Sequence, residues 1–171
     1  MTKKQFFNSL INSQEDVLQH LLDLLKKLDI EYCVIGGLAV NAYAEPVVSL
    51  DLDIVVIADA LDAFKAEAKK LFKIEKFPHS LNLKSPKSDL RIQIQTDPRY
   101  QSFLERASVL TVMDYEMRVA SVEDVLQGKI WAYSDKTRRA SKRQKDLADI
   151  YRLIEKSPRL KKLVPPALLQ K

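Results

Sequence analysis

Residues 50–57 place two aspartates in a segment that is otherwise apolar, reading Leu-Asp-Leu-Asp-Ile-Val-Val-Ile. This alternation has the period of two that is typical of a β-strand. At a strand rise of about 3.3 Å per residue, Asp51 and Asp53 lie on one face, roughly 7 Å apart. We therefore expect a strand that buries Leu52 and Ile54 on one side and holds two carboxylates on the other.

Two carboxylates this close repel each other unless a cation or hydrogen-bond donors compensate their charge. Magnesium prefers carboxylate oxygens, and phosphate oxygens complete its coordination shell. Asp51 and Asp53 are therefore candidate metal ligands. Taken alone, the spacing fits an edge strand with both acids in solvent at least as well.

A pair of glycines follows the preceding apolar segment. Residues 32–35 end at Gly36 and Gly37, two of the three glycines in the chain, and residues 38–44 are predicted to form a short helix before Pro46. Glycine permits close approach of a ligand to the backbone, and a helix N-terminus offers free N–H groups to anions. Because the paired aspartates begin 14 residues after Gly37, the combination indicates a phosphate site more specifically than a lone Gly-Gly turn would.

Hydrophobic periodicity predicts the remaining elements. Helices are expected over 15–29, 60–71, 122–134 and 142–155, and strands over 32–35, 50–57, 73–77, 90–95, 109–113 and 116–120. Residues 78–88 are polar, contain two prolines and are predicted to form a loop. This order predicts an α/β (α+β) fold, with a mixed sheet of about five strands covered by helices and a helical C-terminal third.

The 171 residues fit one compact unit, which we divide into an α/β core, residues 1–120, and a helical extension packed on it, residues 121–171. No apolar run reaches the roughly 20 residues that a membrane-spanning helix needs, and residues 5–13 lack a signal-peptide core. The single cysteine, Cys33, excludes an internal disulfide. We therefore expect a cytoplasmic protein without a membrane partner.

The segments 35–40 (Ile-Gly-Gly-Leu-Ala-Val) and 50–56 resemble motifs of the nucleotidyltransferase superfamily that includes DNA polymerase beta. The sequence is most similar to the small bacterial abortive-infection and type IV toxin-like nucleotidyltransferases. The similarity continues through residues 121–126, Lys129 and residues 142–150, and covers about residues 32–154. It implies a nucleotidyltransferase fold that uses magnesium and binds a nucleoside triphosphate such as ATP.

The resemblance also implies roles for individual residues. Gly36 and Gly37 would hold the triphosphate, and Asp51 and Asp53 would bind magnesium.

Lys129 would contact the nucleotide phosphates, and Asp146 would help to place Lys129 or the nucleotide. Attack on the α-phosphate requires positioning and charge neutralisation, which a metal and a lysine can supply. Without the resemblance, Lys129 would be read as a surface lysine, and Asp146 as a partner of Arg143 or Lys142 one helical turn away.

One position departs from the superfamily pattern. A third carboxylate usually stands on a neighbouring strand, and in residues 91–95 Gln93 occupies that position. A glutamine carbonyl can coordinate a metal weakly but cannot act as a general base. Asp89 and Asp97 are each four residues away, roughly 13 Å at strand rise, which is too far without a bulge. Residues 46–49 also lack the arginine and threonine that often precede the paired acids.

Three functions remain open from the sequence. The first is an enzyme that transfers a nucleotidyl group to RNA, a protein or a small molecule, including a toxin countered by an antitoxin protein. The second is a catalytically degenerate module that binds nucleotide, RNA or a partner protein. The third is a nucleic-acid-binding protein, because residues 129–145 carry seven basic side chains against one acid, although such a run is more often a solvated helix face.

Overall fold

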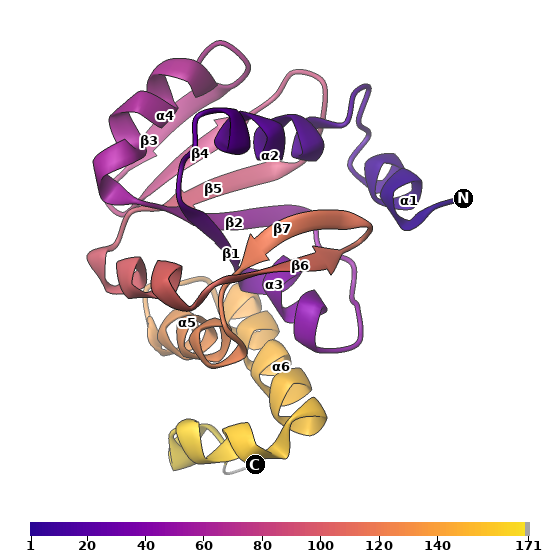
Figure 1. The fold of residues 1–171 in the computed structure, drawn as a ribbon. Helices are drawn as coiled ribbons and strands as arrows, with labels where there is room; N and C mark the ends of the chain where they lie inside the picture. Colours follow the sequence, from indigo (N-terminus) through magenta and orange to yellow (C-terminus); the bar gives the residue numbers. More distant parts are fainter. Residues whose placement is uncertain (170–171) are drawn as a thin grey trace.

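The computed structural model describes residues 1–169 and contains a mixed seven-stranded sheet with helices on both faces (Figure 1). The strands lie in the order β3-β4-β5-β2-β1-β7-β6. The pairs β2/β5 and β1/β7 are parallel, and the other neighbours are antiparallel. The strands are β1 (Tyr32–Ile35), β2 (Asp51–Val56), β3 (Lys73–Phe77), β4 (Ser80–Lys84), β5 (Arg91–Gln95), β6 (Ser108–Val112) and β7 (Tyr115–Val119).

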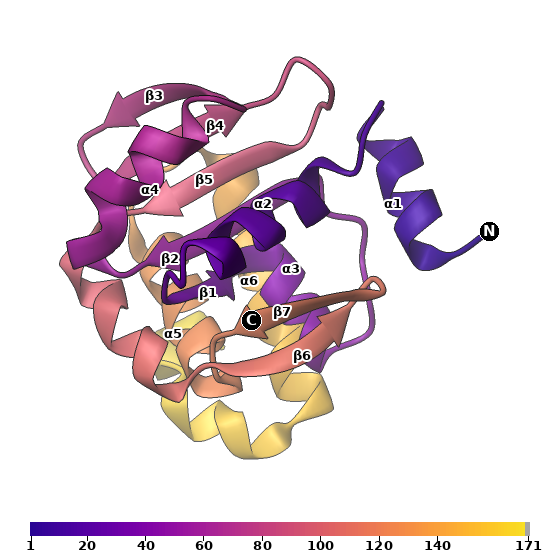
Figure 2. The ribbon, with the colours of Figure 1, turned by 45° about the horizontal axis from the view of Figure 1, so that its top comes forward.

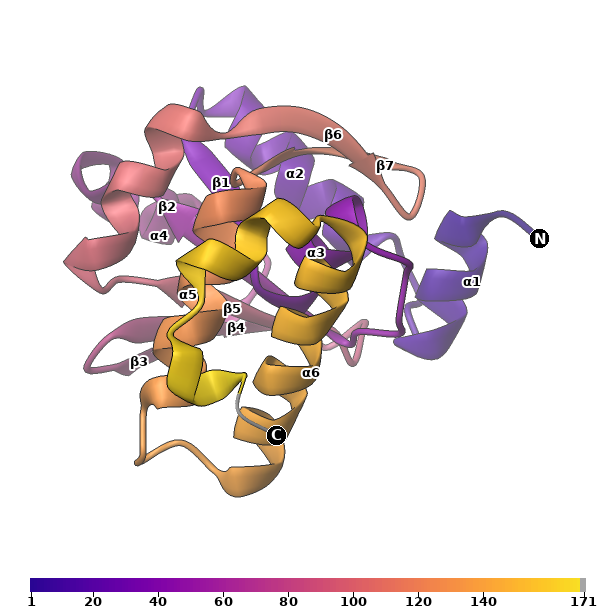
Figure 3. The ribbon, with the colours of Figure 1, turned by 90° about the horizontal axis from the view of Figure 1, so that it is seen from below.

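Helices form a layer on each side of the sheet. Helices α2 (Val17–Lys27) and α4 (Leu61–Ala68) cover one face, which comes forward in Figure 2. Helices α3 (Gly36–Tyr43), α5 (Val122–Ser134) and α6 (Ala140–Lys156) cover the other face, seen from below in Figure 3. Helix α1 (Lys3–Leu10) stands beside the tip of the β6–β7 hairpin (Figure 1). Short 3-10 helices span Ala58–Ala60, Pro98–Arg106, Pro158–Leu163 and Pro166–Leu168.

The central strands follow the predicted alternation. Leu52 and Ile54 of β2 are fully buried and pair in register with Ile92 and Ile94 of β5. The opposite face of β2 carries Asp51 and Asp53, so the apolar alternation fixes the side of the sheet on which the carboxylates stand.

The predicted mixed sheet covered by helices is confirmed, but the sheet has seven strands instead of about five. Strand β4 lies inside residues 78–88, for which the sequence predicts a loop. Pro78 and Pro86 flank this strand without interrupting it, and its Leu81 and Leu83 are buried in the core. The polar composition of the segment therefore concealed a short alternating strand.

Helix α1 is also absent from the prediction. Its N-terminus has a capping box in which the Thr2 hydroxyl accepts from the backbone N–H of Gln5 and the Gln5 side chain accepts from the Thr2 N–H. Phe7 is buried against the rest of the fold, which makes this short helix part of the core. Within residues 1–169, every helix is too short or too polar to cross a membrane. The division of the chain at residue 120 stays a prediction.

Candidate functional site

The two predicted metal ligands stand on β2 beside the predicted third-acid position. Asp53 is in register with Gln93 of the parallel strand β5 and with Ile35 of the antiparallel strand β1. Asp51 is in register with Arg91. Residues in register share a face of the sheet, so the side chains of Asp53 and Gln93 lie next to each other. The structure thus brings Asp51, Asp53 and Gln93 together, as the sequence predicts.

Gly36 lies directly against Asp53. A Cβ atom built on Gly36 would come within 2.3 Å of Asp53 Oδ2, and the φ angle of Gly36 is +72°. Both the close approach and the left-handed backbone require glycine here. Gly36 is also the first residue of α3, so the carboxylate of Asp53 sits beside the start of that helix.

Gly37 packs against a different residue, Ser49. A Cβ atom on Gly37 would lie 3.2 Å from Ser49 Oγ, a tighter distance than side chains normally adopt. The Ser49 hydroxyl donates to the backbone carbonyl of Asp51 at 3.2 Å. Gly37 therefore packs against the segment that leads into the carboxylate strand.

Asp51 and Asp53 have different electrostatic surroundings. Asp51 accepts a hydrogen bond from Arg91 Nε, and its Oδ2 lies 3.7 Å from Lys142 Nζ. Asp53 has no hydrogen-bonded or ion-paired side-chain partner among residues 1–169. Burial raises the pKa of Asp53, Lys129 opposes that rise, and the charge of Asp51 adds to it. Asp53 is thus a carboxylate that would gain from a neighbouring cation.

Lys129 connects helix α5 to two acids of helix α6. Its Nζ lies 3.1 Å from Asp146 Oδ1 and 2.8 Å from Asp149 Oδ2. All three residues are buried. Burial by itself lowers the pKa of Lys129, but the charges of Asp149 and Asp146 outweigh it and raise that pKa above its ordinary value. Lys129 is therefore a charged, nearly enclosed ammonium group.

Two arginines complete this cluster. Arg138 Nε donates to Asp146 Oδ2 at 2.8 Å, and Arg152 Nη1 donates to Asp149 Oδ1 at 2.8 Å. The sequence analysis assigns no individual role to either arginine or to Asp149; it counts Arg138 among the basic side chains of residues 129–145 and includes Asp149 in the motif 142–150. The sequence signal is that Asp149 follows Asp146 by three residues and Arg152 follows Asp149 by three on the same helix, which places them on one face.

Two adjoining cavities share Asp53 and Gln93. The first also includes Gly36, Lys129 and Asp146, which the sequence assigns to the nucleotide, and further Tyr100, Gly128 and Arg138. The second extends the other way, over Asp51, Asn82, Lys84, Arg91 and Lys142. Gly37 lines neither of these two cavities. Asp53 therefore lies where the two cavities meet, and Asp51 lines the second cavity.

The donor atoms at this junction fit a magnesium ion. Two carboxylates and an amide oxygen are hard oxygen ligands, and magnesium in proteins is commonly held by one or two carboxylates together with substrate phosphates. Among residues 1–169, Asp53 has no paired cation and only the more distant charges of Lys129, Arg138 and Lys142 oppose the rise in its pKa, so a bound cation would stabilise its charged form. Within residues 1–169, no group of three or more His, Cys, Asp or Glu side chains is placed to hold a metal ion.

The basic segment 129–145 does not form one charged surface. Lys129 is buried, Lys142 lies near Asp51, and Arg143 donates to the backbone carbonyl of Tyr133 and stacks on its ring. Lys136, Arg138, Arg139 and Lys145 are exposed. The segment is thus divided between the carboxylate site and solvent, which weakens the hypothesis of a continuous nucleic-acid-binding face.

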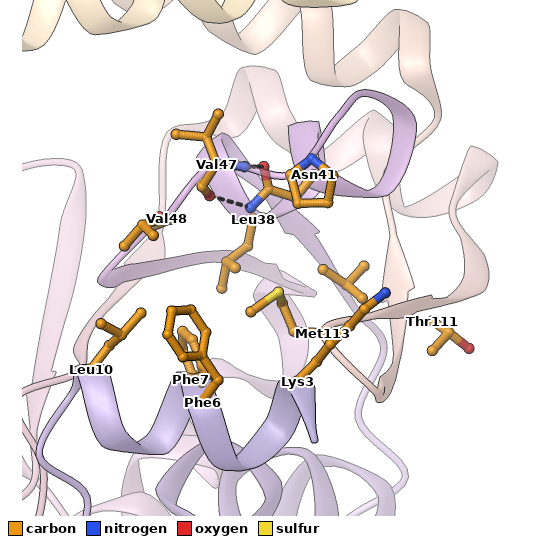
Figure 4. Close-up of a pocket in the computed structure, with 13 residues that line it drawn as sticks. Lys3, Phe6, Phe7, Leu10, Leu38, Asn41, Val47, Val48, Thr111 and Met113 are labelled. Carbon is orange, nitrogen blue, oxygen red and sulfur yellow. Dashed lines mark hydrogen bonds between the residues drawn. The ribbon is translucent and has the colours of Figure 1, made fainter. Parts of the chain in front are cut away.

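A more apolar cavity lies on the other side of α3, between α1 and the segment 46–49. Its walls include Phe6, Phe7, Leu38 and Met113, with Lys3 at the edge (Figure 4). Asn41 holds its rim by donating to the carbonyl of Val47 at 2.7 Å and accepting from the Val47 N–H at 3.0 Å. The acids of the candidate site do not line this cavity.

Several solved structures have the same fold, and two of those described below are named as an adenylyltransferase and a putative nucleotidyltransferase. The chain is similar to the lincosamide antibiotic adenylyltransferase LnuA bound to lincomycin, with a TM-score of 0.58 at 17% identity over 83% of this chain and 99% of that one. It is similar to ANT(2'')-Ia in complex with adenylyl-2''-tobramycin, with a TM-score of 0.64 at 13% identity over 86% and 92% of the two chains. TM1012 from Thermotoga maritima gives a TM-score of 0.54 at 13% identity over 77% and 86%. At these identities the similarity establishes the fold.

A comparison with curated proteins finds no match. The family model described as nucleotidyl transferase AbiEii toxin, Type IV TA system, matches residues 24–171. That range holds the glycine turn, the paired aspartates and the lysine cluster. The chain therefore belongs to the AbiEii family of nucleotidyl transferase toxins.

Proposed function

We propose that the protein is a magnesium-dependent nucleotidyltransferase. A nucleophilic atom of the acceptor would bond to the α-phosphate of a nucleoside triphosphate, and the bond between the α- and β-phosphates would break to release pyrophosphate. The observation that supports this most strongly is the junction of two cavities at Asp53, where one side carries the glycine turn and Lys129 and the other carries Asp51. We place the nucleotide donor in the first cavity and the acceptor in the second.

Asp51 and Asp53 would hold the magnesium ion, which neutralises phosphate charge when it is bound. The glycine at position 36 leaves room for Asp53 at the start of α3, where free backbone N–H groups can bind phosphate. Arg91 and Lys142 compensate Asp51 and line the acceptor side. The chemistry rests on positioning and charge, because phosphoryl chemistry of this kind requires no covalent intermediate on the protein.

Family membership supports a role as the toxin of a type IV toxin–antitoxin pair, with an antitoxin that counters its effect. The acceptor is RNA, a protein or a small molecule. ATP is one candidate donor, and the four nucleoside triphosphates can be compared directly.

A transfer assay tests this proposal. Each nucleoside triphosphate, labelled at its α-phosphate, is incubated with the protein, magnesium and either total RNA, total protein or a small-molecule extract of a bacterium. We expect label in one acceptor fraction with the wild type and none with Asp51→Ala/Asp53→Ala. If the protein bound nucleotide but no acceptor fraction became labelled, the proposal of nucleotidyltransferase activity would be contradicted.

That result would favour the second candidate, a catalytically degenerate binding module. The observation behind it is Gln93, which stands in register with Asp53 where the superfamily pattern expects an acid. If Gln93→Asp creates transfer activity that the wild type lacks, the natural protein is the degenerate form. If it changes nothing while Asp51→Ala abolishes activity, two carboxylates suffice.

A further inference from the structure

We propose that Arg138 is the side chain that binds the outer phosphates of the nucleoside triphosphate, and that Lys129 is a positioning residue behind it. This inference rests on the proposed function, and it assigns the phosphate contact to a residue that the sequence marks only as one of the seven basic side chains in residues 129–145. It follows from how each cation of the cluster is already paired.

Lys129 has little capacity left for a ligand. Its ammonium group faces two carboxylates, Asp146 at 3.1 Å and Asp149 at 2.8 Å, and its side chain is 9% exposed. Two negative charges therefore surround one positive charge, and an incoming phosphate would have to compete with both acids. In this arrangement Lys129 holds helices α5 and α6 in place at the edge of the cavity.

Arg138 is paired differently. Its Nε donates to Asp146 Oδ2 at 2.8 Å, and within residues 1–169 its two terminal nitrogens make no hydrogen bond to a side chain or backbone group. A guanidinium group has five N–H donors in a planar fork that suits phosphate oxygens. One contact to Asp146 orients the group and leaves most of its donors for a ligand.

The position of Arg138 agrees with that role. It stands in the turn between α5 and α6 and lines the cavity that also contains Gly36 and Asp53. Its side chain is 38% exposed, whereas that of its partner Asp146 is 2% exposed. A buried acid thus anchors a guanidinium group whose outer end reaches solvent in the nucleotide cavity.

The charge balance of the cluster also favours Arg138. Lys129, Arg138 and Arg152 face Asp146 and Asp149, which leaves one positive charge in excess. Arg152 does not line the nucleotide cavity. Its Nη2 donates to Asn41 Oδ1 at 3.0 Å and to the backbone carbonyl of Glu45. Arg138 is therefore the cation of this cluster that is both exposed and in the nucleotide cavity.

The test compares ligands that differ only in their number of phosphates. Adenosine, AMP, ADP and ATP, with guanosine and its phosphates as a second series, are titrated with magnesium into wild-type protein, Arg138→Ala and Arg139→Ala. Arg139 is a matched control, because it is the adjacent arginine, is exposed and does not line the cavity. Thermal unfolding establishes that each variant is folded, and Arg138→Lys is measured as well because it retains the charge beside Asp146.

We expect Arg138→Ala to weaken triphosphate binding by about 10- to 100-fold. Binding of the nucleoside and the monophosphate should stay within about twofold, because neither reaches the proposed contact. Arg138→Lys should fall between wild type and Arg138→Ala, because a lysine cannot reproduce the fork. Arg139→Ala should resemble the wild type with every ligand.

Three results would overturn the inference, and they can be told apart. If the wild type binds triphosphate and both Arg138 variants bind it as tightly as Arg139→Ala does, Arg138 is not the phosphate ligand and the proposed function stands. If the wild type binds no nucleoside phosphate at all, both proposals are wrong. An equal loss for nucleoside and triphosphate in Arg138→Ala would also contradict a phosphate contact.

Discussion

Gly36 and Asp53 are so close that a single methyl group on Gly36 would lie 2.3 Å from Asp53 Oδ2. The contact joins the glycine turn before α3 to the carboxylate strand β2, two motifs that are separated in the sequence. It explains why the turn needs a glycine at this position, independently of any ligand. It also gives a way to displace Asp53 without changing its charge.

Gly36→Ala should therefore abolish magnesium-dependent nucleotide binding and lower the free energy of unfolding by about 1–3 kcal/mol, because the φ of +72° is strained for alanine and the methyl group displaces the carboxylate. Calorimetric titration and denaturant unfolding measure the two effects. Gly128→Ala is the control for stability alone, because Gly128 lines the nucleotide cavity; its added Cβ would meet the Tyr100 ring at 3.4 Å and the Phe103 ring at 3.8 Å. That helical site should gain about 0.5–1 kcal/mol. Normal binding by Gly36→Ala would show that the contact does not set the position of Asp53.

Asp53→Asn should raise the stability of the metal-free protein and abolish its response to magnesium. Because burial raises the pKa of Asp53, its charged form costs folding free energy when no cation is bound. In the presence of a chelator the variant should unfold at a temperature a few degrees above that of the wild type. Magnesium should raise the unfolding temperature of the wild type but not of the variant. A variant that is less stable than the wild type in chelator would contradict the assignment.

The same pKa shift fixes a pH dependence. The folded state binds the Asp53 proton more tightly than the unfolded state does, so the stability of the wild type relative to Asp53→Asn should fall as the pH rises from the ordinary value of 3.8 through the raised pKa. Below 3.8 the difference between the two proteins should vanish. Unfolding curves of both proteins at several pH values in chelator test this. If the stability of the wild type relative to Asp53→Asn instead rose with pH, the folded protein would stabilise Asp53 as a carboxylate.

We expect Lys129→Ala to destabilise the folded protein. A loss of activity in this variant would therefore not by itself show that Lys129 takes part in catalysis. The substitution would leave Asp146 and Asp149 buried without their shared cation, a loss of about 3–5 kcal/mol. Chemical denaturation measures this, with the exposed Lys145→Ala as the control for loss of one positive charge. Full stability of Lys129→Ala, with loss of nucleotide binding alone, would instead indicate that the lysine serves the ligand directly.

Gln93→Asp would place a third carboxylate in register with Asp53. Without metal the extra like charge should lower the unfolding temperature, and with magnesium the variant should be stabilised more than the wild type. Gln95→Asp adds the same charge two residues along the strand, opposite Val55, and should show no added response to magnesium. Equal responses of the two variants would show that position 93 is not at the metal site.

The sequence predicts the central part of the site because its signals are local. The alternation in residues 50–57 places Asp51 and Asp53 on one face, and the glycine turn ends the neighbouring strand β1. Gln93 follows from the alternation of β5 together with the family resemblance. In each of these cases the side-chain direction depends only on the period of a strand.

The features that the sequence analysis missed depend on tertiary packing, or lie in a segment whose polar composition is not typical of a strand. Strand β4 escapes prediction because its two buried leucines stand between prolines in a polar segment. The contacts of Lys129 with Asp149, and of Arg138 with Asp146, require the packing of α5 against α6, which no local period specifies. The three-residue spacing of Asp146 and Asp149 on α6 indicates that they share a face of the helix. It does not indicate which cation pairs with them.

The most direct measurement is a titration of the purified protein with each nucleoside triphosphate, with and without magnesium, alongside Asp51→Ala/Asp53→Ala. Asp59→Ala/Asp62→Ala removes the same charge from two exposed positions and is the control. The account predicts binding of at least one triphosphate that requires magnesium, is lost in Asp51→Ala/Asp53→Ala and persists in the control. Binding that survives without metal or without the two aspartates, or no binding by the wild type, would contradict a magnesium–nucleotide site at Asp51 and Asp53.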